Sequence, residues 1–271
     1  MTTQKAVESV RFQRVVVLIS GRGSNLVALH AAMHRPDTGG GEGGAGADSA
    51  AGGETACDLG AETFVAQVAA RIVGVVADRE CAGLAWARER SLPAYLVDRA
   101  KHADRAAFEM RLGAVVSACK PDLVVMAGFL RIVSASFLHA FAGRVINVHP
   151  SLLPAFPGLH THRRALEAGV LLHGATVHWV TADLDAGPII GQAVVAVEAG
   201  DDEHRLAARV LRMEHRLLPL AVSAALRRGA PPASLRGGEG TTRQVAAPDR
   251  DGKAPLLIFD PTLVERWIAR A

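Results

Sequence analysis

Residues 15–34 read VVVLISGRGSNLVALHAAMH, and the hydrophobic pattern changes twice within this stretch. Its first residues form a β-branched, apolar run that is typical of a strand buried on both faces. Its last residues, Asn25–His34, carry apolar side chains at helical spacing. A short glycine-containing turn joins the two parts. The stretch therefore predicts one strand followed directly by one helix.

The same alternation recurs along the chain. Further buried strands are expected at Arg71–Ala77, Leu123–Gly128 and Arg144–His149, and helical spacing is found over Glu80–Arg90 and Arg105–Lys120. Strands that alternate with helices predict an α/β fold built on a doubly wound, parallel sheet. In such a sheet, ligands bind in the crevice at the carboxyl ends of the strands.

The composition restricts the class of protein. The chain has 271 residues, of which 49% are hydrophobic, and a formal net charge of +3, values that suit a globular protein with one large α/β domain or two small ones. Clusters of Lys and Arg interleaved with aromatic residues are missing, which argues against nucleic acid as the main partner. The three cysteines form neither a disulfide framework nor a CxxC metal site. No apolar run approaches the roughly 20 residues of a membrane span, so we expect a soluble, cytoplasmic protein.

Two segments depart from the alternating pattern. Pro36–Thr63 holds nine glycines and neither Lys nor Arg, so it cannot bury enough apolar surface to fold, and we expect a disordered insert that contains Cys57. Residues 229–271 are expected to form a linker and a C-terminal tail, in which Asp260 caps and Pro261 opens a short helix. The predicted domain therefore spans residues 14–228 and contains the insert.

The turn ISGRGSNL, residues 19–26, is a candidate phosphate site. Backbone N–H groups at a helix N-terminus bind anions, and the two glycines allow the ligand to approach the backbone closely. Ser24 and Asn25 add side-chain donors. A dinucleotide fingerprint needs glycine where this chain has Leu26. The residues alone favour a mononucleotide or sugar phosphate, with a plain strand-to-helix turn or a dinucleotide as the alternatives.

A polar pair stands at the end of the strand predicted over residues 144–149. Asn147 and His149 alternate with apolar residues, so their side chains point to the same face of the strand. Pro150, Pro154 and Pro157 restrict the loop that follows. A lone histidine at this position would most often be a core residue bonded to the backbone. Two polar residues on one face at the carboxyl edge favour a role in chemistry instead.

A second polar cluster lies in GATVHWVTADLDAGPII. Its first half predicts a strand with Thr176 and His178 on one face, and its second half predicts a turn. Aspartates in turns often bond their own backbone, which is the expected role of Asp183. The residues alone leave the role of Asp185 open. If Asp185 lies beside His149, its carboxylate favours the charged imidazolium and fixes the orientation of the ring.

Four motifs together resemble the phosphoribosylglycinamide formyltransferase family: ISGRGSNL, AGFLRIVS, INVHPSLLPAFPGLHTHRRAL and HGATVHWVTADLDAGPII. The resemblance implies a Rossmann-like, mostly parallel sheet. It also implies transfer of the formyl group of 10-formyltetrahydrofolate, the co-substrate, to the amine of glycinamide ribonucleotide in purine (IMP) biosynthesis. No metal is implied, and a homodimer is compatible with the family. The expanded Pro36–Thr63 segment and the tail after Arg228 depart from the family pattern.

The resemblance places the family's catalytic Asn, His and Asp on Asn147, His149 and Asp185. In the implied reaction, the substrate amine attacks the formyl carbon, and negative charge develops on the formyl oxygen. Asn147 and a protonated His149 donate hydrogen bonds to that charge, which in comparable oxyanion sites lowers the barrier by roughly 3–4 kcal/mol for each donor. Asp185 keeps the imidazolium charged and orders a water molecule for proton transfer.

Binding residues are implied for both substrates. The contacts to the ribonucleotide fall on Gly23, Ser24, Asn25 and Glu214. The contacts to the formyl folate fall on Arg105, Leu130, Arg131, Ile132, Val133, Asn147, Thr181, Ala182, Asp183, Leu184 and Asp185. The remaining histidines of this region lack metal-ligand spacing and are expected in supporting positions, with His178 nearest the chemistry.

Two related enzymes share the HPSLLP motif, namely formyltetrahydrofolate deformylase and methionyl-tRNA formyltransferase. The first carries an N-terminal regulatory domain and the second a C-terminal tRNA-binding domain, whereas few residues precede the first strand here and the tail after Arg228 is short. The motifs SGRGSN and PGLHTH favour the glycinamide enzyme. A non-catalytic nucleotide-binding module would keep the glycine turn without needing Asn147, His149 and Asp185 together.

Overall fold

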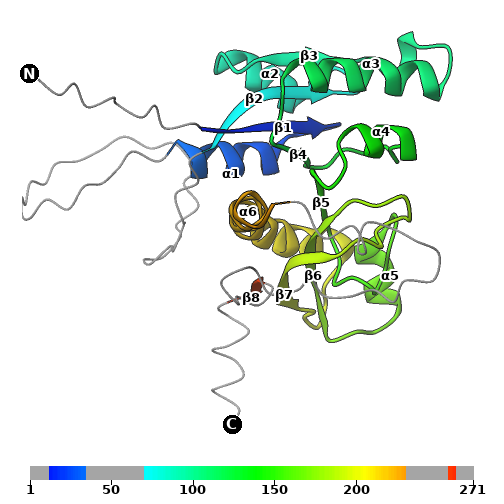
Figure 1. Ribbon diagram of the computed structural model, residues 1–271. Helices are drawn as coiled ribbons and strands as arrows, with labels where there is room; N and C mark the ends of the chain where they lie inside the picture. Colours follow the sequence, from blue (N-terminus) through cyan, green and yellow to red (C-terminus); the bar gives the residue numbers. More distant parts are fainter. Residues whose placement is uncertain (1–11, 35–69, 230–255, 261–271) are drawn as a thin grey trace, which may run out of the picture.

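The computed structural model describes residues 12–34, 70–229 and 256–260, which form one eight-stranded mixed sheet with helices on both faces (Figure 1). The predicted insert at Pro36–Thr63, with Cys57, lies outside the described residues, as does the helix expected from Pro261. The strands are β1 Gln13–Ile19, β2 Ala70–Ala77, β3 Ala94–Leu96, β4 Leu123–Met126, β5 Val145–His149, β6 Leu172–Trp179, β7 Ile189–Ala196 and β8 Leu256–Phe259.

The strand order in the sheet is β3-β2-β1-β4-β5-β6-β7-β8. Strands β1 to β5 pair in parallel, β6 is antiparallel to both of its neighbours, and β8 is parallel to β7. The chain runs outward from β1 to β3 and then returns to β4 on the other side of β1. This reversal creates the crevice at the carboxyl ends of the strands where ligands bind in doubly wound sheets.

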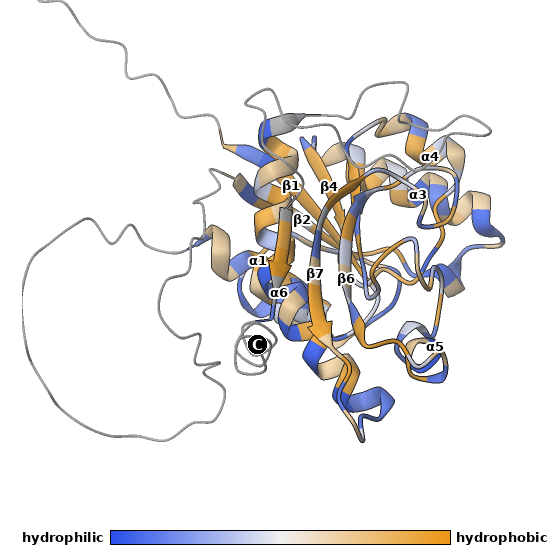
Figure 2. Cartoon of the chain, turned by 90° about the horizontal axis from the view of Figure 1, so that it is seen from below, coloured by the Kyte–Doolittle hydropathy of each residue, from blue (hydrophilic) through white to orange (hydrophobic). Residues whose placement is uncertain are grey.

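Each face of the sheet is covered by its own helices. They are α1 Ser24–Met33, α2 Ala82–Glu89, α3 Arg105–Ala118, α4 Ala135–Ala140, α5 Thr161–Glu167 and α6 Glu203–Arg228. In β1, Val15 and Val17 pack into the core that holds apolar residues of α1, α2 and α6, whereas Val16 and Leu18 pack against α3 and α4. Because both faces are buried, β1 from Val15 to Ile19 and the whole of β4 are apolar (Figure 2).

The predicted doubly wound, mostly parallel α/β sheet is confirmed. The residues after Arg228 were expected to contain only a linker and a capped helix, yet Leu256–Phe259 pairs with β7, and the N–H of Asp260 donates to the carbonyl of Val194 at 2.9 Å. The sheet therefore extends beyond the predicted domain boundary. A four-residue apolar run has too little periodicity for sequence to separate a strand from other structure.

Within the part of the chain that the structure describes, no helix has both the length and the apolarity needed to cross a membrane. The 26-residue α6 is long enough, but it alternates buried apolar residues with charged ones and packs along β6 and β7. This position brings its middle turns next to α1, at the carboxyl edge of β1.

Candidate active site

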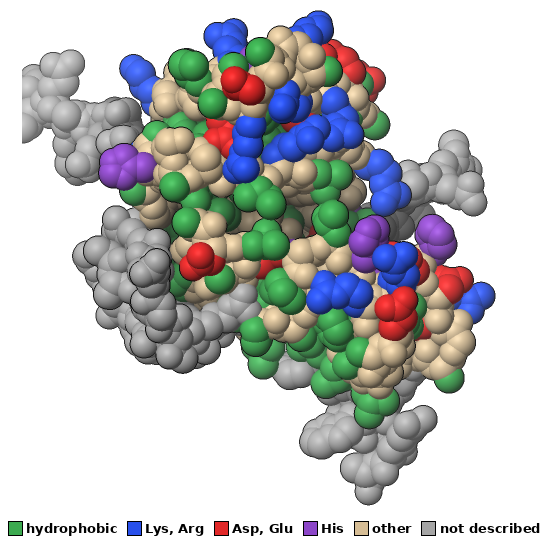
Figure 3. Space-filling view, turned by 90° about the vertical axis from the view of Figure 1, so that its right-hand side faces the viewer, with side chains coloured by type: hydrophobic (Ala, Val, Ile, Leu, Met, Phe, Trp, Pro, Cys, Tyr) green, Lys and Arg blue, Asp and Glu red, His purple; other side chains and the backbone are tan. Residues whose placement is uncertain are grey.

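The glycine turn lies where β1 ends and α1 begins. Figure 3 views the molecule from the side toward which β1 points in Figure 1. Gly23 has a φ of +77°, which only glycine adopts readily, and a Cβ atom there would lie 2.6 Å from the Cα atom of Gly83. The N–H of Gly83 also donates to the carbonyl of Gly21 at 3.1 Å. The start of α2 is thus packed against the turn, and no side chain fits at position 23.

A buried polar pair lies one residue further along. The Asn25 side-chain N–H donates to the Glu214 carboxylate at 2.6 Å, and both residues are 7% exposed. Burial raises the pKa of Glu214 to about 7, although the hydrogen bond from Asn25 acts in the opposite direction. Asn25 Oδ1 accepts no hydrogen bond from the described residues. An acid that titrates near neutral pH and a free acceptor therefore lie side by side behind the glycine turn.

At the other side of the crevice, β5 and β6 present polar residues to each other. Asn147 pairs with His178 across the strands, and His149 pairs with Thr176. The Asn147 side-chain nitrogen is 3.3 Å from His178 Nε2, and His178 Nδ1 is 2.9 Å from the carbonyl of Trp179. Because a carbonyl only accepts, Nδ1 of His178 carries the hydrogen. When the ring is neutral, Nε2 therefore accepts from Asn147.

His149 lies between two acceptors. Its Nδ1 atom is 3.4 Å from the Asp185 carboxylate, and its Nε2 atom is 3.1 Å from the carbonyl of Phe156. Only the doubly protonated imidazolium can donate to both. Asp185 also accepts from the N–H of Gly158 at 2.8 Å and lies 3.7 Å from His178 Nε2. Asp185 therefore lies between the two histidines, and the contact expected between Asp185 and His149 is present.

The turn that carries Asp185 exposes three residues just before it but buries Asp185 itself. Asp185 is 9% exposed and has a φ of +50°, a left-handed conformation that is uncommon outside glycine. Such backbone strain is found mostly at functional sites, where surrounding contacts enforce it. Its neighbours Ala182, Asp183 and Leu184 point to solvent, and Leu184 is 54% exposed.

The loop after His149 is held by side chains as well as by its prolines. The hydroxyl of Thr176 donates to the carbonyl of Ser151 at 2.7 Å and accepts from the N–H of Leu153 at 3.0 Å. Gln192 donates to the carbonyl of Leu153 at 3.0 Å, and the Ser151 hydroxyl donates to that of Ala155 at 2.7 Å. Strands β6 and β7 thus fix the loop that carries Phe156 against His149.

The segment Leu130–Val133 follows β4 at the same edge of the sheet. Leu130 and Ile132 are 65% and 62% exposed, whereas Val133 is buried. Arg105, the first residue of α3, donates to the carbonyl of Ile132 at 3.0 Å. The structure thus brings Arg105 to this segment, as the implied folate contacts require.

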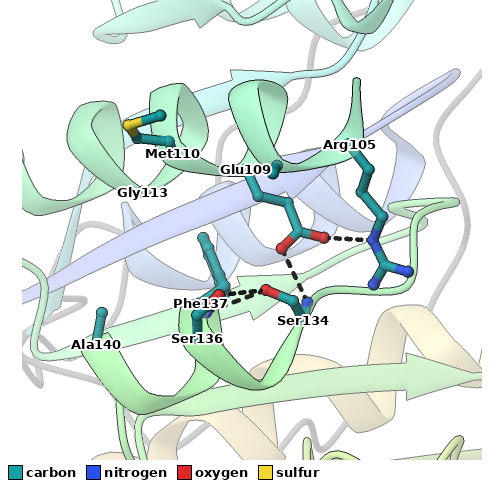
Figure 4. A pocket seen from close by; sticks show the side chains of 9 residues that line it. Arg105, Glu109, Met110, Gly113, Ser134, Ser136, Phe137 and Ala140 are labelled. Atoms are coloured by element: carbon teal, nitrogen blue, oxygen red, sulfur yellow. Dashed lines mark hydrogen bonds and ion pairs between the residues drawn. The ribbon is translucent and has the colours of Figure 1, made fainter. Parts of the chain in front are cut away.

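Sequence reasoning missed two acidic residues that contact this segment. Arg131 Nε lies 2.6 Å from the carboxylate of Asp78, which directly follows β2. The carboxylate of Glu109 accepts from the N–H of Ser134 at 3.1 Å, beside a surface cavity of about 480 Å³ between α3 and α4 (Figure 4). The position of Asp78 at a strand end was a usable signal. The sequence around Glu109 gave no such signal, because charged residues are common on the solvent-exposed face of a helix.

The other histidines support the loop rather than the crevice. His162 Nδ1 lies 3.2 Å from His173 Nε2, and burial lowers the pKa of His173 to about 4, so that ring is neutral. His160 precedes α5 with a φ of +58°. Among the residues that the structure describes, no three His, Cys, Asp or Glu side chains are grouped closely enough to hold a metal ion.

Comparison with known proteins identifies relatives over most of the chain. The formyl transferase family model matches residues 52–222. A phosphoribosylglycinamide formyltransferase of Mycobacterium tuberculosis (strain ATCC 25618 / H37Rv) is 47% identical over 163 residues, 60% of this chain and 76% of that protein. The trifunctional purine biosynthetic protein adenosine-3 of Drosophila pseudoobscura pseudoobscura is 38% identical over 231 residues, 83% of this chain and 15% of that protein. The crystal structure of glycinamide ribonucleotide transformylase 1 from Symbiobacterium toebii has a TM-score of 0.67 and 38% identity, and the match covers 82% of this chain and 92% of that one.

Proposed function

This chain belongs to the formyl transferase family, and from this membership we infer that it is a phosphoribosylglycinamide formyltransferase of purine (IMP) biosynthesis. The observation that carries the inference is the pairing of two sites at one edge of the sheet. The glycine turn of β1 suits a phosphate, and the polar cluster of Asn147, His149 and Asp185 suits acyl chemistry.

We propose that the glycine turn holds the phosphate of glycinamide ribonucleotide. Gly23, Ser24 and Asn25 supply backbone and side-chain donors at the N-terminus of α1. The Glu214 carboxylate and the free Asn25 Oδ1 atom are acceptors, so they suit the ribose hydroxyl groups of the same ligand. This orientation directs the glycinamide amine along the crevice toward β5.

The formyl donor of this family is derived from folate, and we propose that it is 10-formyltetrahydrofolate. The exposed apolar side chains of Leu130, Ile132 and Leu184 flank the crevice end and suit a flat aromatic ring. Arg105, whose side chain is 56% exposed, suits a carboxylate of the folate tail. The contacts proposed for the remainder of the cofactor are Arg131, Val133, Thr181, Ala182 and Asp183.

In the proposed reaction, the amine nitrogen of the ribonucleotide forms a bond to the formyl carbon, and the bond from that carbon to the folate nitrogen breaks. The proton released by the amine ends on the folate nitrogen. Charge develops on the formyl oxygen in the tetrahedral intermediate. The free N–H of the Asn147 amide and the Nε2–H of His149, which exchanges the Phe156 carbonyl for this oxygen, donate to that charge.

We propose that Asp185 acts through His149 and through a water molecule. Its carboxylate faces Nδ1 and so keeps the ring protonated while Nε2–H donates a hydrogen bond to the oxyanion. The same group orders the water that carries the proton from amine to folate nitrogen. The proposal assigns no step to a metal ion.

One assay tests this function. The chain is supplied with 10-formyltetrahydrofolate, with and without glycinamide ribonucleotide, and loss of the formyl group is followed. Formyl loss only when the ribonucleotide is present supports the proposal. Equal loss without it identifies a formyltetrahydrofolate deformylase. No loss in either case contradicts the proposal and leaves a transferase with another formyl acceptor or a non-catalytic module.

A further inference from the structure

The segment of residues 130–134 between β4 and α4 has no regular secondary structure, so its backbone groups need other partners. Side chains supply three of them. The N–H of Leu130 donates to the hydroxyl of Ser20 at 2.9 Å, and the carbonyl of Ile132 accepts from Arg105 at 3.0 Å. The N–H of Ser134 donates to the carboxylate of Glu109 at 3.1 Å. The segment is therefore held at its start by Ser20, which follows β1, and at its end by α3.

A buried carboxylate, that of Asp78, holds the N-terminal end of residues 130–134. The Asp78 side chain has no solvent exposure, and it accepts from Arg131 at 2.6 Å and from Arg79 at 3.2 Å. Burial on its own raises the pKa of Asp78, but hydrogen bonds from Arg79, Arg131 and Ser20 outweigh it and hold the pKa below its ordinary value. Asp78 is thus charged at neutral pH, and it fixes Arg131 directly and Leu130 through Ser20.

A second buried carboxylate, that of Glu109, holds the C-terminal end of residues 130–134. Glu109 is 7% exposed and accepts from Arg105 Nε at 2.7 Å (Figure 4). The same arginine donates to the carbonyl of Ile132. The second carboxylate oxygen of Glu109 accepts from the N–H of Ser134. Glu109 therefore holds both the Arg105 guanidinium and the backbone N–H of Ser134, the N-cap residue of α4.

We propose that Asp78 and Glu109 are positioning residues that hold residues 130–134 in the shape that binds the formyl folate. This inference rests on the proposed function of the chain. Apolar packing cannot supply that shape by itself, because Leu130 and Ile132 are mostly exposed. Two ionic anchors that keep exposed apolar side chains in place are expected where those side chains form part of a ligand site.

The variants Asp78→Asn and Glu109→Gln test the proposal, because each keeps the side-chain volume and removes the charge. The expected result is a rise of about tenfold in the KM for the formyl folate, with the KM for the ribonucleotide changed by about twofold or less. The matched control is Asp122→Asn. Asp122 also accepts from a backbone N–H, that of Arg14 at 2.8 Å, but at the amino end of β4.

A purely structural role gives a different outcome. A residue with only a structural role lowers the melting temperature and the active fraction when it is replaced, while both KM values stay unchanged. This result is expected for Asp122→Asn. The same result for Asp78→Asn and Glu109→Gln overturns the proposal. An equal rise in both KM values overturns it too. In the double mutant Asp78→Asn/Arg131→Gln, the rise in folate KM should be little more than in the larger single, because both changes break one link.

A readout that needs no activity separates this inference from the proposed function. Amide hydrogen exchange of the unliganded chain should be faster at Ser134 in Glu109→Gln and at Leu130 in Asp78→Asn, and unchanged at both in Asp122→Asn. If the unaltered chain transfers no formyl group, the proposed function fails, whatever the exchange rates are. If it is active and the exchange rates are unchanged, the positioning role fails alone.

Discussion

The side-chain nitrogen of Asn147 lies 3.3 Å from Nε2 of His178, and the two residues face each other directly across β5 and β6. His178 is fixed by the 2.9 Å hydrogen bond from its Nδ1 atom to the carbonyl of Trp179. The ring can therefore accept from Asn147 only while it is neutral. This bond orients the Asn147 amide and leaves its second N–H directed away from His178.

Replacing His178 should weaken the oxyanion donor without removing it. We expect His178→Ala to lower kcat by about tenfold, because the Asn147 amide is then free to rotate, and to change the folate KM less. His178→Gln offers a carbonyl acceptor to Asn147 and should recover part of the loss. Steady-state kinetics of both variants provide the measurement. An unchanged kcat in His178→Ala would mean that other contacts orient Asn147.

Gly23 and Gly21 form a matched pair for testing the glycine turn. Gly23→Ala should destabilise the fold by about 2 kcal/mol or more, because its Cβ atom meets Gly83 at 2.6 Å and its φ is +77°. Nothing lies within 4 Å of a Cβ atom at Gly21, so the melting temperature of Gly21→Ala should be close to that of the unaltered chain. Calorimetry of the two variants tests this difference.

The same turn is expected to discriminate between the two substrates. Gly23→Asp adds a carboxylate that repels phosphate and blocks close approach to the backbone, so the ribonucleotide KM should rise far more than the folate KM. Kinetics of the folded fraction test the expectation. Equal rises for both substrates would show that the turn does not discriminate between them, whereas a general folding defect would lower the active fraction and leave both KM values unchanged.

Sequence patterns predicted the features that depend on the repeat of a single strand or helix. They did not predict contacts between segments that are distant in the sequence. The shared face of Asn147 and His149 follows from the two-residue repeat of a strand. In the structure Asn147 contacts His178, and both His178 and His149 lie beside Asp185. The contact between His149 and Asp185 depends on a left-handed turn, which the residues alone left open. Family resemblance supplied it. Asp78 and Glu109 were missed because the partners that tie them to residues 130–134 are distant in the sequence: Arg131 lies 53 residues from Asp78, and Ser134 lies 25 residues from Glu109.

Glu214 should make stability fall as pH rises. Its pKa is about 7 in the folded chain, against 4.5 when it is unburied, so between these values the folded state binds more protons than the unfolded state. The stabilisation is complete below pH 4.5 and is lost as pH rises through 7. The difference between these two pKa values corresponds to roughly 3 kcal/mol of unfolding free energy. Denaturant unfolding at pH 5 and pH 8 measures it.

Glu214→Gln provides the control for this pH dependence, because it cannot titrate. The buried His173, with a pKa of about 4, has the opposite effect, since stability is lost as pH falls from 6.5 toward 4. This contribution is common to both chains and cancels in their difference. The difference in unfolding free energy should therefore shift in favour of Glu214→Gln as pH rises. A constant difference would contradict the raised pKa.

His149 and Asp185 are expected to act as one unit. Asp185→Asn removes a charge and almost no volume, so the chain should fold, and His149→Ala removes the proposed cationic donor. Each should lower kcat by roughly 10²- to 10⁴-fold, because the imidazolium needs the carboxylate 3.4 Å from its Nδ1 atom. The Kd of the formyl folate should change much less, since these groups act mainly on charge that develops in the reaction. The double mutant should be little worse than the worse single mutant, because either change alone already removes the charged ring. Steady-state kinetics and folate titration of the three variants provide the measurements. If the two losses in kcat multiply in the double mutant, the residues act independently and Asp185 does not work through His149.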